Sequence, residues 1–297
     1  MKKTFLIPIV LFLTIAFCAC GTTVTEAEIT LTPAPTMTPT PTPEPTPEII
    51  VVSNMDYSIS MPVGLRTGKY SGDTIEGVPN GIGRFDSQNS AGEKWWYVGE
   101  WVDGVFDGEG YCEWESGSKN TGIYKNYELN GEGEIKYVNG AVLKGTFVDG
   151  TISGRGQYLA NMGKVLYEGT FEDGKLTRTQ EELDALKTEL KTQAENISYK
   201  EYAKHPYEYE GKLLYVKGRV AWINEYNNGL IEGALYVNGS YSYPIYFSYW
   251  ISKTEARILE KENVELWGIF DGIYSYESIE GELITLPMLR PIVMKSR

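Results

Sequence analysis

The chain has 297 residues, a formal net charge of −13 and a single histidine, His205. Such an acidic chain repels a phosphate backbone, so we expect no nucleic-acid partner. One histidine and three cysteines supply too few ligands for the common zinc sites, so neither a metal nor another cofactor is expected.

The first residues have the pattern of an export signal. Residues 1–3 carry charge, and Thr4–Ala19 is almost wholly apolar. Sixteen residues are fewer than the roughly 20 that span a bilayer, so residues 1–19 are predicted to be a signal peptide.

The end of this signal, FCACG at residues 17–21, resembles the lipobox of bacterial lipoproteins. Cys20 follows a small alanine and is the predicted lipidated residue, whereas Cys18 follows a bulky phenylalanine. The motif departs from the family's pattern three residues before Cys20, where phenylalanine replaces leucine. The resemblance implies a diacylglycerol anchor and a position on the extracytoplasmic face of the cell membrane. An ordinary cleaved signal is the alternative.

Residues 20–48 are predicted to be a tether. Proline alternates with threonine from Thr32 to Pro47, a pattern that excludes helix and sheet. We expect an extended spacer, roughly 45–50 Å long at about 3.1 Å per residue, that holds a folded body away from a bilayer. Residues 49–69 are interpreted as a lead-in segment before the first repeat.

The region from residue 70 to 178 repeats itself at intervals of 23 to 27 residues. Aromatic residues alternate with glycine, as in Tyr97-x-Gly99-x-Trp101, which is typical of one face of a strand. Hairpins of this kind are not stable alone, so we expect them to stack on their neighbours, with bare glycines leaving room for neighbouring rings. The leading glycines are Gly72, Gly99, Gly122, Gly145 and Gly169, and the glycine pairs that follow them are Gly81 and Gly83, Gly108 and Gly110, Gly131 and Gly133, and Gly154 and Gly156.

Gly99-Glu100-Trp101, followed by Gly108-Glu109-Gly110, resembles the motif of MORN repeats. The resemblance covers about residues 70–176, and the last unit looks like half a repeat. It implies a protein-interaction scaffold, in some cases associated with lipid, that is not catalytic by itself.

Asp103, Asp149 and Asp173 each precede a turn glycine, where aspartate stabilises the turn; a calcium or catalytic role is the alternative. Cys112 falls in an apolar column of the repeat. We therefore expect it to be a buried core residue rather than a nucleophile.

A linking helix is expected over residues 179–197. Thr179–Glu182 fits a capping box, and Leu183, Leu186 and Leu190 fall on one helical face. We expect this helix to close the open end of the repeat stack. Ser198–Glu201 predicts a second, short helix that ends at Pro206.

Residues 198–297 are predicted to form a small barrel. From Gly211 the pattern predicts three strands, a helix from Ser252 to about Lys261 and two more strands, which is the order of an OB-fold. Val216–Val220 and Val264–Gly268 also resemble strands of bacterial OB-fold domains. The expected fold class is mainly β: a stacked MORN β-hairpin array, a linking helix and a small OB-fold-like β-barrel.

OB-folds bind oligonucleotides, oligosaccharides or proteins on the face of their second and third strands. The candidate ligand-binding residues are Tyr243, Tyr246, Tyr249 and Trp250 on this face, with Trp222 nearby. Their rings could stack on sugars or bases, and core packing is the alternative. The nearly balanced charge of this domain differs from the basic groove that single-stranded nucleic acid requires.

The pattern as a whole predicts a non-catalytic lipoprotein of the cell envelope that acts as a tethered scaffold or binding protein. Its expected partners are the membrane, through the lipid anchor, and a protein or an envelope polysaccharide. A glycan-binding module is the alternative function. A hydrolase with paired carboxylates is a third hypothesis, but no acidic residue lies in a recognisable catalytic context.

Overall fold

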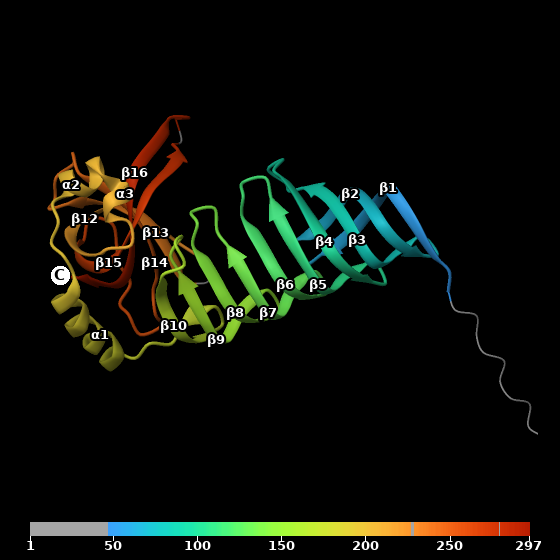
Figure 1. Ribbon diagram of the computed structural model, residues 1–297, viewed down its shortest axis with the longest axis horizontal. Coiled ribbons are helices and arrows are strands. Elements are labelled where there is room, and N and C mark those ends of the chain that lie inside the picture. The colour runs from blue at the N-terminus through green and yellow to red at the C-terminus, as the bar shows by residue number, and fades with distance from the viewer. Residues whose placement is uncertain (1–46, 227–228, 279) are drawn as a thin grey trace, which may run out of the picture. The chain divides into compact units, whose positions relative to one another are not determined.

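The computed structural model describes residues 47–226, 229–278 and 280–297 (Figure 1). The predicted signal peptide, Cys20 and all but the end of the tether lie outside these residues. None of the helices within the described ranges combines the length and the apolar character needed to cross a membrane.

Eleven strands of the described chain form one antiparallel sheet, in which every strand pairs with the next one in sequence (Figure 1). The lead-in segment is part of this sheet, because it contains β1 and the first half of β2. The strands are β1 (Ile49–Met61), β2 (Gly64–Ile75), β3 (Val78–Gln88), β4 (Lys94–Val102), β5 (Val105–Trp114), β6 (Lys119–Lys125), β7 (Glu128–Lys136), β8 (Val142–Val148), β9 (Thr151–Leu159), β10 (Val165–Glu172) and β11 (Lys175–Leu176).

The repeated glycines form a continuous row across the sheet. Their residue pairs are in register from β2 to β10, through Gly72, Gly83, Gly99, Gly110, Gly122, Gly133, Gly145, Gly156 and Gly169. At several positions an aromatic ring fills the space above the glycine, as predicted. A Cβ at Gly110 would lie 2.5 Å from the Tyr97 hydroxyl oxygen, and one at Gly83 would lie 2.3 Å from the Tyr70 hydroxyl oxygen.

The prediction of ring space at Gly122 and Gly145 is wrong in detail. A Cβ at Gly145 would first meet backbone atoms of β9, with the Arg155 carbonyl oxygen at 2.6 Å and the Gly156 Cα at 2.8 Å. At Gly122 the nearest atoms belong to the backbone of β7. In this part of the row glycine allows close approach of adjacent strands, and Asn120 and Leu143 stand where Tyr70 and Tyr97 lie in the earlier repeats.

The turns between paired strands confirm the predicted role of the three aspartates. Asp103, Asp149 and Asp173 have φ of 48°, 46° and 47°, and the glycine after each also has positive φ. Two successive left-handed residues define the type I′ hairpin turn, which suits the twist of paired strands. Each turn also bonds to the preceding hairpin, so the turns line one edge of the sheet: the amides of Gly104, Gly150 and Gly174 donate to the carbonyls of Pro79, Leu129 and Ile152 at 2.9, 2.9 and 3.0 Å.

One face of the sheet carries the apolar core of the array. Tyr97 and Phe106 stack with ring centroids 3.8 Å apart, and Trp101 meets both edge-on. Cys112 is 5% exposed in this core, as expected, and burial raises the pKa of its thiol to about 12. The thiolate is therefore scarce at neutral pH, which argues against a nucleophilic role.

The linking helix is α1 (Gln180–Gln193), and its predicted capping box is present. The Thr179 hydroxyl accepts from the Glu182 amide, and the Glu182 carboxylate accepts from the Thr179 amide. The prediction that α1 closes the repeat stack is wrong, since Leu190 packs on barrel residues Trp267 and Val293. Barrel side chains close the stack instead, and Leu230, Trp250 and Ile269 join the core of the sheet.

The C-terminal domain is a closed five-stranded barrel with the order β12-β13-β14-β16-β15. The strands are β12 (Leu213–Glu225), β13 (Leu230–Val237), β14 (Pro244–Trp250), β15 (Asn263–Glu277) and β16 (Leu283–Ser296). The predicted strand order is confirmed, and the barrel closes through parallel pairing of β14 with β16. Two short helices, α2 (Tyr199–Lys204) and α3 (Pro206–Tyr209), precede it, and Tyr202 of α2 enters the barrel core beside Leu214 and Phe270.

The predicted helix from Ser252 to Lys261 does not form. Glu255 accepts from the Ser252 amide at 2.7 Å, as in a capping box, but it also accepts from the Tyr249 hydroxyl. The Ser252 hydroxyl donates to the Arg178 carbonyl at 2.9 Å instead of capping a helix. The side chains of Ser252 and Glu255 therefore both bind groups outside the predicted capping box. The helix that contributes a side chain to the barrel core is α2, which precedes the barrel in sequence.

A buried polar network joins the sheet to the barrel. The Arg290 guanidinium of β16 is fully buried, pairs with Asp271 and donates to the Asn139 carbonyl and, at 3.3 Å, to the Tyr158 hydroxyl. Asp271 also accepts from the Asn161 amide at 3.3 Å. Because a buried charge is stable only with its partners in place, this network fixes one arrangement of the two parts.

Candidate binding sites

A patch of aromatic side chains lies on the outer face of the barrel. Trp222, Ala234 and Tyr246 are in register across β12, β13 and β14. Tyr274 and Tyr276 of β15 extend the patch, and the Tyr246 and Tyr274 ring centroids are 4.4 Å apart. Trp222 lies 6.2 Å from Tyr246 and 6.1 Å from Tyr276. This is the strand face on which OB-folds bind their ligands.

The patch combines apolar ring surface with an acidic edge. Trp222, Tyr274 and Tyr276 are half-buried, whereas Tyr246 is 3% exposed. Glu232 accepts from the Tyr226 hydroxyl at 3.0 Å and from the Asn139 side-chain amide at 2.8 Å. Burial, followed by the nearby Glu232 charge, raises the pKa of Tyr226 to about 12, so its hydroxyl stays protonated. Flat rings beside hydroxyls and a carboxylate can stack on a sugar and hydrogen-bond to it.

Only part of the predicted aromatic set lies in this patch. Trp222 and Tyr246 belong to it, but Tyr249 and Trp250 are each 1% exposed and pack in cores, which leaves no ring face for a ligand. Tyr243 lies elsewhere, stacked on Tyr199 with ring centroids 4.8 Å apart.

Sequence reasoning missed Tyr274 and Tyr276. Their spacing of two residues in a predicted strand indicates a shared face, and this signal could have identified them. What the sequence did not provide was the register, which places Tyr274 opposite Leu286 and Tyr276 opposite Ile284.

A second candidate is an apolar groove of about 300 Å³ on the sheet. Trp95, Trp114 and Tyr127 form part of its wall, and the exposed Val63 lies at its margin. Tyr127 takes the place that glycine has in the other turns, with φ of 74°, and its hydroxyl donates to the Gly104 carbonyl at 3.1 Å. The departure from the glycine pattern thus supplies one wall of the groove.

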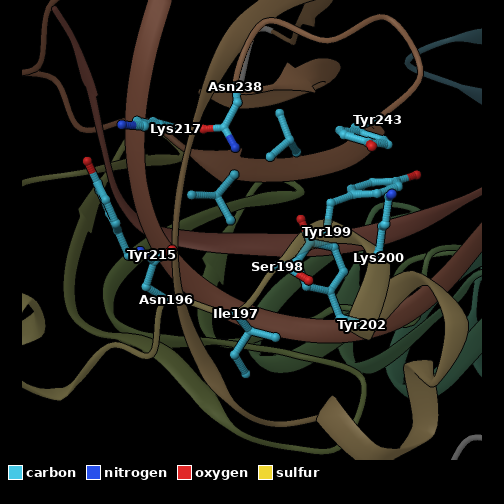
Figure 2. A pocket seen from close by; sticks show the side chains of 12 residues that line it. Asn196, Ile197, Ser198, Tyr199, Lys200, Tyr202, Tyr215, Lys217, Asn238 and Tyr243 are labelled. Carbon is cyan, nitrogen blue, oxygen red and sulfur yellow. The ribbon is translucent and has the colours of Figure 1, made fainter.

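A third hollow, of about 440 Å³, lies where α2 meets the barrel. Figure 2 shows Lys217 and Asn238 on one side of it and Tyr199, Lys200 and Tyr243 on the other. The remaining candidate groups do not gather at a site. Within the described ranges no cluster of three histidine, cysteine or acidic residues could hold a metal ion, and His205 is a half-exposed residue beside Glu208.

Part of the sheet matches a known family of repeats. The MORN-repeat pattern matches residues 97–119, 121–142 and 144–165. Residues 97–165 contain three MORN repeats. The comparison with curated proteins gave no match.

The three MORN repeats coincide with structural units. Each match begins in the first strand of a hairpin, at β4, β6 and β8, and runs through its second strand. The hairpins β2–β3 and β10–β11 continue the same glycine row and turn bonds on either side. MORN repeats indicate a binding or scaffold role.

Proposed function

We propose that the protein is a non-catalytic lipoprotein of the cell envelope, a tethered scaffold that binds a protein partner through its MORN sheet. The lipobox resemblance at Cys20 and the proline-rich spacer support the envelope location. The MORN repeats support the binding role. A lipid-anchored body on a spacer of this kind presents its binding surfaces away from the bilayer.

The apolar groove between Val63 and Tyr127 is the observation that carries the proposal. Trp114 and Tyr127 are half-buried there, and accessible aromatic rings in a shaped groove are the kind of surface that dominates protein–protein binding. The buried Arg290 network keeps the groove at a fixed position relative to the barrel, so both parts can engage one partner at the same time. Such preorganisation lowers the entropic cost of binding.

Affinity capture from envelope extracts with the full chain tests the proposal. Val63→Asp places a charge at the groove margin, where the side chain is 70% exposed. Val102→Asp is the matched control, because Val102 is 47% exposed and does not line the groove. We expect the first variant to lose a partner that wild type and the control retain. Equal capture by all three proteins would contradict binding through the groove.

Glycan binding is a second candidate function, and the aromatic patch favours it. Trp222, Tyr274 and Tyr276 offer ring surface beside the Glu232 carboxylate, an arrangement that suits neutral sugars. A glycan array with wild type and Trp222→Ala tests this function. Tyr241→Ala is the control, because Tyr241 is 74% exposed outside the patch. Array signals that are insensitive to Trp222→Ala would exclude the patch.

A further inference from the structure

The hollow between α2 and the barrel is distinct from the groove and from the aromatic patch. It lies against the start of β12, the end of β13 and the turn that leads into β14. Its volume of about 440 Å³ falls in the range of small-molecule sites. The aromatic patch around Trp222 and Tyr246 belongs to another part of the barrel surface.

The charge of this hollow contrasts with the charge of the chain. Lys200 and Lys217 line it, and no aspartate or glutamate does so among the described residues, although the chain carries a net charge of −13. Glu265, which accepts from the wall residue Tyr215 at 2.6 Å, is also paired with Arg297 at 2.5 Å. An adjoining hollow of about 510 Å³ shares Lys217 and Asn238 and, in the described chain, likewise has no acidic wall residue. The surface is therefore locally suited to an anion.

Neutral polar groups and a ring complete the wall. Asn196, Ser198 and Asn238 bring amide and hydroxyl groups, and Tyr243 contributes an aromatic surface (Figure 2). Ser198 precedes α2, but its side chain makes no capping hydrogen bond. The wall thus offers lysines for an anion, amides for hydroxyl groups and an aromatic ring that can pack on a sugar.

We propose that this hollow binds a small anionic sugar, in which a phosphate or carboxylate group lies between Lys200 and Lys217 and the sugar ring lies toward Tyr243. This site does not depend on the groove, on the aromatic patch or on lipidation.

Calorimetric titration of the full chain tests the site with four probes: glucose 1-phosphate, glucuronate, glucose and inorganic phosphate. We expect one or both sugar anions to bind, which decides between phosphate and carboxylate as the anionic group. Glucose and inorganic phosphate should bind at least tenfold more weakly, because each lacks half of the recognised chemistry. Equal binding of inorganic phosphate and glucose 1-phosphate, or binding of neither sugar anion, would overturn the proposal.

Variants assign the binding to this hollow. Lys217→Gln and Lys200→Gln should each weaken binding of the sugar anion about tenfold, whereas Lys144→Gln, on the exposed face of β8, should leave it unchanged. Trp222→Ala should also leave it unchanged, which separates this site from the aromatic patch. Loss of binding in either of these two controls would place the anion elsewhere.

Discussion

At the scale of single residues, glycine determines how closely the strands of the array can approach. At Gly145 a side chain would collide with the Arg155 carbonyl and with Gly156, neither of which can rotate away. The sequence predicted a row of glycines on one face, and the row exists. It did not predict that backbone atoms, rather than rings, would occupy the space, because side-chain volume varies between repeats while the glycine columns do not.

Gly145→Val should therefore lower the free energy of unfolding by about 1–3 kcal/mol through overpacking. Lys144→Val is the matched control, since it places the same side chain on the exposed face of β8. Urea denaturation of both variants measures the difference. If Gly145→Val unfolds at the same urea concentration as the control, the row has no steric role.

The lipid anchor that we propose also depends on a single residue, Cys20. If it carries the lipid, Cys20→Ala should abolish palmitate labelling and release the protein from membranes, because the acyl chains supply the membrane affinity. Cys18→Ala should retain both properties. Label that remains on Cys20→Ala and disappears from Cys18→Ala would reverse the assignment.

At the scale of elements, a capping box in the sequence predicts a helix correctly where its polar groups have no competing partners. Thr179 and Glu182 cap α1 as their spacing predicts. The same motif at Ser252 and Glu255 failed, because Arg178 and Tyr249 bind its polar groups and only Ile258 of the following segment is a buried hydrophobic residue. The spacing of capping residues can be read from the sequence. The sequence does not reveal partners that are about 75 residues away along the chain, as Arg178 is from Ser252.

Thr179→Ala should destabilise the protein by about 1 kcal/mol, since it removes the hydroxyl that accepts from the Glu182 amide. Thr179→Ser retains that hydroxyl and should behave as wild type. Thermal unfolding followed by circular dichroism provides the measurement. Equal loss in both variants would mean that the threonine methyl group, and not the cap, stabilises α1.

At the scale of the whole molecule, Arg290 determines how the array and the barrel are joined. Its partners Asn139 and Tyr158 belong to the sheet, and Asp271 belongs to the barrel. No repeat or motif marks these positions, so the sequence predicted two domains but not the interface between them. The last hairpins and the barrel also share one apolar core.

Arg290→Met should cost about 3–5 kcal/mol, because it leaves the Asp271 carboxylate buried without a counter-charge. Arg290→Met combined with Asp271→Leu should cost less than the single change. Calorimetry should show the array and barrel of the single variant unfolding in separate steps. A single variant with unchanged stability would show that water already solvates the pair.

The arrangement of carboxylates leads to a prediction about chemistry. Asp103, Asp149 and Asp173 lie in turns along one edge of the sheet, whereas glycosidic hydrolysis needs two carboxyl groups facing each other about 5–10 Å apart across a sugar. We expect no hydrolysis of peptidoglycan, peptide or ester substrates above the buffer rate. Turnover that disappears when one acidic residue is replaced would refute the scaffold proposal.

The turn-to-turn hydrogen bonds have a consequence for how such a protein can change over generations. Each hairpin meets the next through the same glycine row and the same turn bond, and the described hydrogen bonds to the barrel all fall at or after Asn139. Duplication or deletion of a coding segment for one unit would thus leave both ends intact. The number of hairpins is free to vary by copying, so the reach of the array can be selected independently of what the barrel binds.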